Sequence, residues 1–267
     1  MKLAQPRGLS RRRVQRLLEA QHDRPTSSRI EHLSRYFLGH SYKPNPLIGS
    51  ADKAEVFTAS LDGFDCVTYI ETVVALARAS DVDDFTEWLR KIRYEQGRIQ
   101  WKQRNHYMTL WIRNNVRNGI IRPLSMPAVP ILNRERVLDV VPGLPAQQTR
   151  VKCVAKQALP RLEPHLQSGD LMFFASTRKN LDVFHCGILV CDGKRVLMRH
   201  ASRSQGRVVE QELRQFLGAN RMAGIIVVRA QEMTRRIAVN NRVMTRLSVK
   251  QTPSSQRRNG TKRRVRL

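Results

Sequence analysis

The stretch VFHCGILVCDGKRVLMRHA, residues 183–201, contains two apolar runs separated by Asp192-Gly193. Asp-Gly between two such runs is a strong short-range signal for a β-hairpin closed by a two-residue turn. With that turn, His185 is directly opposite His200 on the neighbouring strand. Cross-strand partners share one face of the sheet, so the two imidazoles are predicted to lie within hydrogen-bonding distance. A slip of one residue in either strand would separate them.

Working outward from the hairpin, apolar patterning predicts helices in the first part of the chain and strands in the second. The helices are predicted at residues 27–38, at LDGFDCVTYIETVVALARA (61–79) and at residues 83–94. The strands are predicted at LMFFA (171–175), in the two arms of the hairpin and at IIVVRA (225–230). The proline-rich residues 120–145 are predicted to form an extended connection or an irregular strand. Helices followed by strands indicate the α+β class.

Positive charge is concentrated at the two ends of the chain. The sequence has 48 Lys+Arg and 22 Asp+Glu, a net charge of +26, of which residues 231–267 supply 11 − 1 = +10 and residues 1–28 supply 7 − 2 = +5. We therefore predict a basic N-terminal extension at 1–28, a folded domain at 29–230 and a basic, disordered tail at 231–267. Such a tail is either a contact site for an anionic polymer, nucleic acid or a cell-wall polymer, or a solvated basic terminus without a partner.

Several classes of protein are excluded by what the sequence lacks. No run approaches the roughly 18 consecutive apolar residues of a membrane span. The N-terminal residues carry positive charge without an apolar core, so no secretory signal is visible. The cysteines at positions 66, 153, 186 and 191 have no CxxC spacing. Neither a disulfide framework nor a metal site is predicted.

Cys66 stands at the start of the apolar helix predicted at 61–79. The first turn of a helix offers unpaired N–H groups and a positive dipole end, which stabilise a thiolate and can bind an oxyanion. On spacing alone, Cys66 could equally be a small core hydrophobe. Together with the opposed histidines it predicts a cysteine hydrolase, in which Cys66 is the nucleophile, His185 the base and His200 the group that orients His185.

Five segments carry a resemblance to a known family: FDCVTYIETVVALARA, RNHYMTLW, SGDLMFF, LDVFHCGILV and RHAS. In this order they resemble the N-acetylmuramoyl-L-alanine amidase-like family, which is related to the NlpC-type papain-like cysteine peptidases, and the resemblance spans about residues 29–230. It implies a permuted papain-like fold, in which the nucleophile helix packs on a small antiparallel sheet. It also implies a peptidoglycan or muropeptide substrate, cleaved at an amide bond at or near the link between muramic acid and L-alanine.

The resemblance also assigns residues. It implies Cys66 as the nucleophile, His185 as the base and His200 as the third catalytic member, with Ser202 as the alternative third member. It places Asp65, Glu71, Asn105, His106 and Tyr107 near the cleft. From their chemistry, Tyr107 and Trp111 would form an apolar floor, while Asn105 and His106 would donate hydrogen bonds to substrate. The alternatives are an ordinary core anchor for residues 105–111 and a structural ion pair with an arginine for Glu71.

No metal or organic cofactor is expected, because a thiolate supplies the nucleophile that zinc-dependent amidases obtain from bound water. The resemblance implies the cell envelope or periplasm, while the lack of a visible leader leaves a cytoplasmic location open. Two other functions stay open from sequence. One is a non-catalytic module that binds a polyanion on the same fold, and the other is a cysteine acyltransferase or deamidase.

Overall fold

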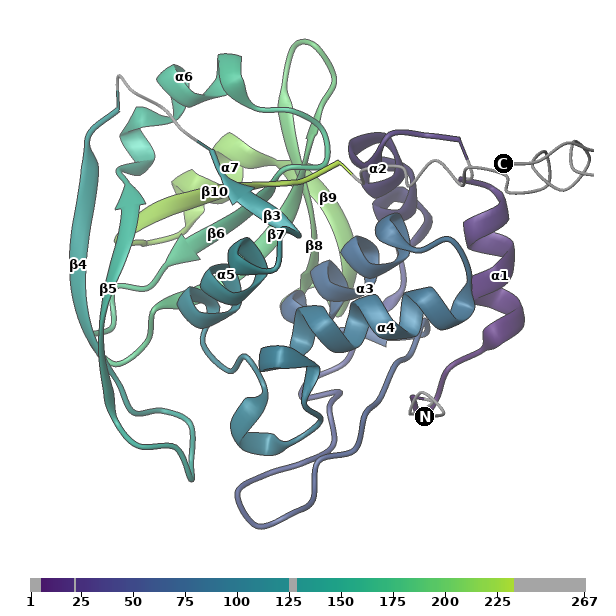
Figure 1. Cartoon of the computed structure of the whole chain (residues 1–267). Coiled ribbons are helices and arrows are strands. Elements are labelled where there is room, and N and C mark those ends of the chain that lie inside the picture. Colours follow the sequence, from purple (N-terminus) through teal and green to yellow (C-terminus); the bar gives the residue numbers. More distant parts are fainter. Residues whose placement is uncertain (1–5, 22, 125–128, 233–267) are drawn as a thin grey trace, which may run out of the picture. The chain divides into compact units, whose positions relative to one another are not determined.

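A computed structural model describes residues 6–21, 23–124 and 129–232 (Figure 1). The chain divides into two units, Met1–Met233 and Thr234–Leu267. The second unit lies outside the described residues. The tail predicted at 231–267 is therefore described only at Gln231 and Glu232.

The helices of the first part of the chain form close to where the apolar pattern predicts them. They are α1 (Arg11–Glu19), α2 (Thr26–Tyr36), α3 (Cys66–Arg78), α4 (Val82–Arg93) and α5 (Met108–Arg117). Helix α1 was not predicted, because its residues were assigned to the basic extension at 1–28. It buries Val14, Leu17 and Leu18 in the same apolar core as α3. Residues 11–19 are thus part of the folded unit.

In the described part of the chain, ten strands form one sheet with the order β2-β1-β9-β8-β7-β6-β10-β5-β4, and β3 pairs with β10. The strands are β1 (Ser41–Tyr42), β2 (Gly63–Phe64), β3 (Ile121–Pro123), β4 (Ile131–Leu138), β5 (Gln147–Val154), β6 (Leu171–Ala175), β7 (Val183–Cys191), β8 (Val196–Ser202), β9 (Arg207–Glu212) and β10 (Gly224–Ala230). Neighbours are antiparallel except β1 and β2. This confirms the mixed α+β class, although the sheet is larger than the small one predicted. The extended connection predicted at 120–145 contains β3 and β4.

The sheet carries a helical layer on each face (Figure 1). Side chains of a strand alternate between faces, and in β6 Leu171 and Phe173 join the core that contains α1 to α4, whereas Met172 and Phe174 join a second core with α6 and α7. The remaining helices are short. They are η1 (Glu95–Gly97), η2 (Trp101–Gln103), η3 (Lys156–Ala158), α6 (Leu159–Leu162), η4 (Glu163–His165) and α7 (Leu213–Ala219).

The β7–β8 hairpin forms, but its register differs from the predicted one by two residues. Leu189 pairs with Met198, whereas a turn at Asp192-Gly193 would pair Leu189 with Val196. The prediction that His185 lies directly opposite His200 is therefore wrong. Because a shift of two residues keeps every side chain on its own face, the two histidines still share a face as diagonal neighbours.

The register shift has its cause in the turn. Asp192 N–H donates to Arg195 O at 3.2 Å, which leaves Gly193 and Lys194 as the two turn residues. Gly193 has a φ of +86°, the conformation needed at the first central position of a type II′ turn. The side chain of Asp192 fixes this turn, because its Oδ1 accepts from the N–H groups of Lys194 at 3.1 Å and Arg195 at 2.7 Å.

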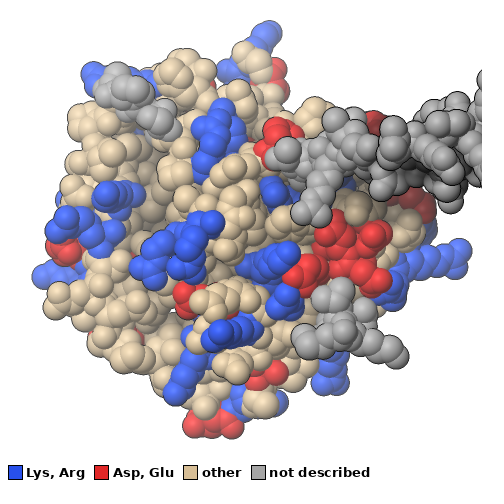
Figure 2. Space-filling model, viewed as in Figure 1, with Lys and Arg blue, Asp and Glu red and all other residues tan. Residues whose placement is uncertain are grey.

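Basic side chains are distributed over the face of the molecule seen in Figure 2, and acidic side chains gather in fewer places. This distribution agrees with the net charge of +26. Within the described residues, no helix has the length and apolar character needed to cross a membrane.

Candidate active site

Helix α3 begins at Cys66 because Asp65 caps it. Asp65 Oδ1 accepts from the N–H of Thr68 at 2.7 Å, and Thr68 Oγ1 accepts from the N–H of Asp65 at 3.1 Å, which together make a capping box. Among the described residues, the N–H groups of Cys66 and Val67 have no hydrogen-bond partner. The sulfur of Cys66 thus stands at the positive end of a helix, beside two free donors.

His185 and His200 meet on one face of β7 and β8. Their Nε2 and Nδ1 atoms are 2.7 Å apart, and the rings meet edge to face with centroids 4.7 Å apart. On β9, Gln211 Oε1 accepts a hydrogen bond of 3.0 Å from His200 Nε2–H. A neutral imidazole carries one proton, so His200 Nδ1 accepts from His185 Nε2–H. While His185 is neutral its Nδ1 carries no proton, and this atom takes the proton of the Cys66 thiol when the thiolate forms.

Cys66 is linked to this pair of histidines and to Cys186. Hydrogen bonds from Cys186 and then from His185 hold the pKa of Cys66 well below its ordinary value, against the opposing effect of burial. The Cys186 sulfur lies 3.3 Å from the carbonyl oxygen of Cys66. Burial raises the pKa of Cys186 well above its ordinary value. Of the two sulfurs, Cys66 therefore carries the negative charge and Cys186 keeps its proton.

The environment of the histidines is largely apolar. The ring of Phe216, on α7, packs with its centroid 5.5 Å from that of His185 and 5.6 Å from that of His200. Burial, together with the neighbouring His185, lowers the pKa of His200 to about 4. His200 is therefore neutral at neutral pH. It must be neutral for its Nδ1 to accept the hydrogen bond from His185 Nε2–H.

The negative charge of Cys66 contributes to the raised pKa of two further groups. Burial and then the charge of Cys66 raise the pKa of Asp65 to about 6. Burial and the charges of Cys66 and Asp65 also raise the pKa of Tyr42, on β1. Tyr42 pairs with Phe64 where β1 and β2 meet, two residues before Cys66 in the sequence.

Glu71 and Trp111, predicted near the cleft, lie in the interior. Glu71 Oε2 accepts from Arg93 Nε at 2.7 Å, and both side chains are about 2–3% exposed. Trp111 is fully buried, donates from Nε1 to Glu71 Oε1 at 3.3 Å and packs against Phe173. Glu71 is thus the structural partner of an arginine, and Trp111 is a core anchor, which corrects the prediction of substrate contact for both.

Asn105 and Tyr107 are also internal. Asn105 donates from Nδ2 to Ile92 O at 3.0 Å and accepts at Oδ1 from Asn114 Nδ2 at 2.7 Å. Tyr107 is 2% exposed, and its hydroxyl accepts from the N–H of Val141 at 3.3 Å. Their hydrogen-bonding groups hold the protein together, so the prediction that they contact substrate is corrected as well.

His106 and Ser202 have partners of their own. His106 Nε2–H donates to Trp101 O at 2.7 Å, and burial lowers the pKa of His106. Its single donor is therefore used within the protein. Ser202 Oγ lies 3.2 Å from Ser204 Oγ and accepts from the N–H of Gln205 at 3.3 Å. The Ser202 hydroxyl therefore bonds within the β8–β9 turn. The side chain that contacts His185 is that of His200.

Of the predicted residues, Cys66, His185, His200 and Asp65 come together. Sequence reasoning missed Cys186, Gln211 and Tyr42. Gln211 lies on a strand that was not predicted, and Tyr42 lies outside every predicted helix and strand. Cys186 was visible as the direct neighbour of His185 but was given no role. All four cysteines are free.

Comparison with known proteins places the chain in a family. The chain matches the N-acetylmuramoyl-L-alanine amidase-like family over residues 32–225. No curated protein matches it.

Among solved structures, the chain is similar to a protein from Legionella pneumophila with 20% identity and a TM-score of 0.74, covering 83% of this chain and 95% of that one. It is similar to an N-acetylmuramoyl-L-alanine amidase from Bacteroides uniformis with 24% identity and a TM-score of 0.68, covering 77% and 99%. It is also similar to a putative xylanase from Bacteroides fragilis with 25% identity and a TM-score of 0.64, covering 74% and 99%.

Proposed function

The chain belongs to the N-acetylmuramoyl-L-alanine amidase-like family, and we propose that it hydrolyses an amide bond of peptidoglycan with Cys66 as the nucleophile. The bond is the one at or near the link between muramic acid and L-alanine. The observation that carries the proposal is the chain of contacts from His185 through His200 to Gln211, together with the low pKa of Cys66, to which Cys186 and His185 contribute.

In the first half of the reaction, the Cys66 thiolate attacks the carbonyl carbon of the amide. The negative charge that develops on the carbonyl oxygen is stabilised by the free N–H groups of Cys66 and Val67. His185, which has taken the thiol proton at Nδ1, donates it to the leaving nitrogen as the C–N bond breaks. The products are a free amine and a thioester on Cys66.

In the second half, a water molecule attacks the thioester carbonyl. His185 Nδ1 accepts a proton from this water, the C–S bond breaks, and the carboxylic acid leaves. His200 stays neutral throughout and holds the ring of His185 through the 2.7 Å contact. No bond in this sequence needs a metal ion.

The proposal also covers two further points, the permuted papain-like type of the fold and the cellular location. A nucleophile at the start of a helix that packs against β7 and β8 supports a permuted papain-like arrangement. A peptidoglycan substrate puts the site of action in the cell envelope.

The name of the Bacteroides fragilis neighbour raises glycoside hydrolysis as an alternative. That reaction uses two carboxyl groups on either side of the scissile bond. The carboxyl groups near Cys66 on its own helix have other tasks, because Asp65 caps α3 and Glu71 pairs with buried Arg93. The geometry therefore favours amide hydrolysis.

The test is digestion of purified muropeptides by the wild-type chain and by the variants Cys66→Ala and Cys153→Ala, with products identified by mass spectrometry. Cys66→Ala is expected to lower the rate by at least about 10³-fold, because the nucleophile is lost. Cys153→Ala removes a buried thiol elsewhere and is expected to retain activity.

The products also distinguish the alternatives. Hydrolysis at the muramic acid–L-alanine link releases the intact stem peptide, and an acyltransferase would instead join the acyl group to an added amine. If Cys66→Ala digests muropeptides as fast as the wild-type chain, cysteine catalysis is wrong.

A further inference from the structure

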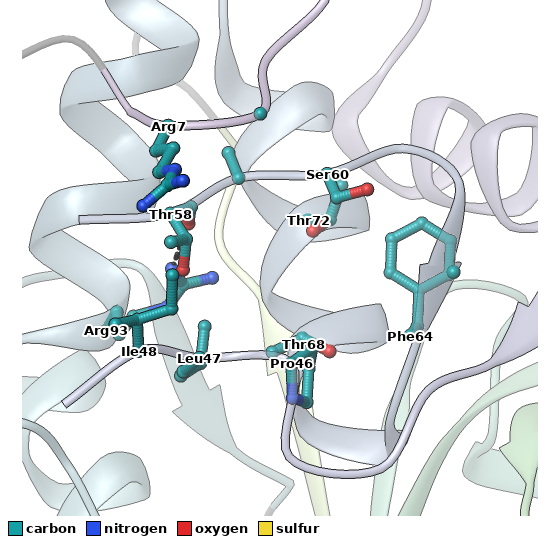
Figure 3. A pocket seen from close by; sticks show the side chains of 13 residues that line it. Arg7, Pro46, Leu47, Ile48, Thr58, Ser60, Phe64, Thr68, Thr72 and Arg93 are labelled. Carbon is teal, nitrogen blue, oxygen red and sulfur yellow. Dashed lines mark hydrogen bonds between the residues drawn. The ribbon is translucent and has the colours of Figure 1, made fainter. Parts of the chain in front are cut away.

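A cavity of about 200 Å³ lies against the first two turns of α3, and none of the proposed catalytic side chains lines it (Figure 3). Its walls come from segments that are distant in the sequence, namely residues 7–8, 46–48, 58–60 and 63–64. Thr68 and Thr72 of α3 and Arg93 at the end of α4 complete the lining. Cavities in proteins are usually filled by side chains, so one this size needs an explanation.

The inner wall of the cavity holds polar groups that the protein itself does not satisfy. Arg93 is 2% exposed, and it donates from Nε to Glu71 at 2.7 Å and from Nη1 to Thr58 O at 2.5 Å. Its Nη2 makes no hydrogen bond to a described residue, and this atom is not among the fully buried polar atoms that lack a partner, so it keeps some contact with solvent. The hydroxyl of Thr58 is buried without a partner. Buried hydrogen-bonding groups are nearly always paired, with protein, water or ligand.

The outer wall brings a second positive charge. Arg7 N–H donates to Phe57 O at 2.8 Å, and Arg7 O accepts from the N–H of Ala59 at 3.0 Å, so the N-terminal segment is tied across the cavity like a short strand. Figure 3 shows the Arg7 side chain pointing toward Thr58 and Arg93. Arg7 lies outside residues 32–225, the part of the chain that matches the family.

These groups define what the cavity can hold. Two guanidinium groups converge there, and one buried carboxylate, that of Glu71, pairs with Arg93, so one positive charge is left over. Guanidinium and hydroxyl donors suit a carboxylate. The remaining walls are apolar, with Leu47, Ile48 and Phe64 among them. The volume equals about seven water molecules at roughly 30 Å³ each, which suits an amino-acid-sized group.

We propose that this cavity binds a carboxylate carried on a short aliphatic group, in which the carboxylate contacts Arg93, Thr58 and Arg7 and the aliphatic part contacts the apolar walls. A free small acid and the carboxyl end of a short peptide share this chemistry. The proposal is independent of the reaction at Cys66, because binding is measured without turnover.

The experiment is isothermal titration of the full chain carrying Cys66→Ala with four probes: propionate, propionamide, acetyl-alanyl-alanine and the amide of that dipeptide. Each acid is expected to bind at least ten-fold more tightly than its amide, because only the acid meets the two guanidinium groups. Tighter binding of the dipeptide acid assigns the site to a peptide end, and tighter binding of propionate assigns it to a free acid. Equal binding of acids and amides, or binding of neither, overturns the proposal.

Variants place the binding in this cavity. Thr58→Val removes only the unpartnered hydroxyl, so the ligand-free chain is expected to melt no lower than its parent while acid binding weakens about ten-fold. Arg7→Gln is expected to weaken acid binding to a similar degree. The matched controls are Thr86→Val, whose hydroxyl donates to Val82 O within α4, and Arg12→Gln, at an exposed position of α1, and both variants are expected to bind acids normally. Unchanged acid binding in Thr58→Val and Arg7→Gln overturns the assignment.

Discussion

At the scale of single residues, the neighbouring sulfurs of Cys66 and Cys186 determine which thiol reacts. One S–H proton on Cys186 lies within reach of both the carbonyl oxygen and the sulfur of Cys66. The Cys186 S–H can donate to only one of these two acceptors at a time, and the thiolate of Cys66 is a stronger acceptor than the carbonyl oxygen. Because this lowers the pKa of Cys66, its thiolate is present in the folded chain at pH values where an ordinary cysteine is still protonated.

We predict that Cys186→Ala moves the pH profile of Cys66 alkylation by iodoacetamide to higher pH, because loss of the Cys186 donor raises the pKa of Cys66. Cys186→Ser keeps an O–H donor and is expected to retain most of the reactivity. The rate is measured by mass spectrometry against pH, with Cys191→Ala as the control on the same strand. An unchanged pH profile in Cys186→Ala would contradict a role for this thiol.

Gln211 fixes the protonation pattern of the two histidines, because its Oε1 accepts from His200 Nε2–H. We predict that Gln211→Leu lowers kcat roughly 10- to 100-fold, the range for partners that orient functional histidines, and changes KM little. Gln211→Glu keeps the acceptor and is expected to retain activity at neutral pH.

The pH profile tests this role more sharply than the rate does. A carboxylate at position 211 favours the protonated form of His200, whose pKa is about 4 in the native chain. Protonated His200 no longer accepts from His185, so the acidic limb of the kcat profile is expected to move to higher pH in Gln211→Glu. If the limb stays where it is in the wild-type chain, Gln211 has only a packing role.

At the scale of elements, the sequence predicted α2, α3, α4, β6, β7, β8 and β10, because each has a clear apolar period. The β7–β8 register was wrong because two turns compete for the same glycine, and local sequence does not decide between them. Strand β9 was missed because its pattern is mixed. Strand β4 was predicted only as part of an extended connection or irregular strand at 120–145, and its pattern is mixed as well, since Ile131 is 64% exposed while Arg136 is 9% exposed. Strand β4 lies at an edge of the sheet, so the exposure of each side chain depends on what packs beside that edge. The sequence does not reveal these neighbours.

The residues of the candidate site also divide into those that sequence could predict and those that it could not. The position of Cys66 follows from local rules, since a helix start is set by its cap. The burial of Asn105 and Trp111 does not, because a polar or aromatic side chain has the same chemistry whether its partner is a ligand or the protein interior. Only the contacts with Ile92, Asn114 and Glu71 decide between these uses.

The ion pair between Glu71 of α3 and Arg93 of α4 joins the two helices that hold the nucleophile in place. We predict that Glu71→Gln lowers the free energy of unfolding by about 3 kcal/mol, because it leaves the Arg93 charge buried without its counterion. The double variant Glu71→Leu with Arg93→Met replaces the pair by apolar groups and is expected to be closer to the wild-type chain. Urea denaturation measures both, and a double variant that is less stable than Glu71→Gln would contradict this reasoning.

At the scale of the whole molecule, the net charge of +26 gives the chain a long-range attraction for anionic polymers that is separate from the chemistry at Cys66. A peptidoglycan layer that carries anionic polymers would concentrate the chain near its substrate. Positive charge is most dense at residues 231–267, which hold +10 of the total, and Arg257, Arg258, Arg263 and Arg264 supply four of these charges.

We predict that replacing these four arginines by glutamine reduces the salt dependence of binding to single-stranded DNA, used here as a defined polyanion. Each lost phosphate contact removes about 0.7 from the slope of log K against log salt, so four lost contacts would reduce the slope by about 3. The same four arginines replaced by lysine keep the charge and should keep the slope. Hydrolysis of soluble muropeptides is expected to be unchanged in both variants, while digestion of intact cell walls falls only in the glutamine variant. If the glutamine variant keeps the wild-type slope, these four arginines do not contact the polymer, and the attraction comes from other basic residues of the chain.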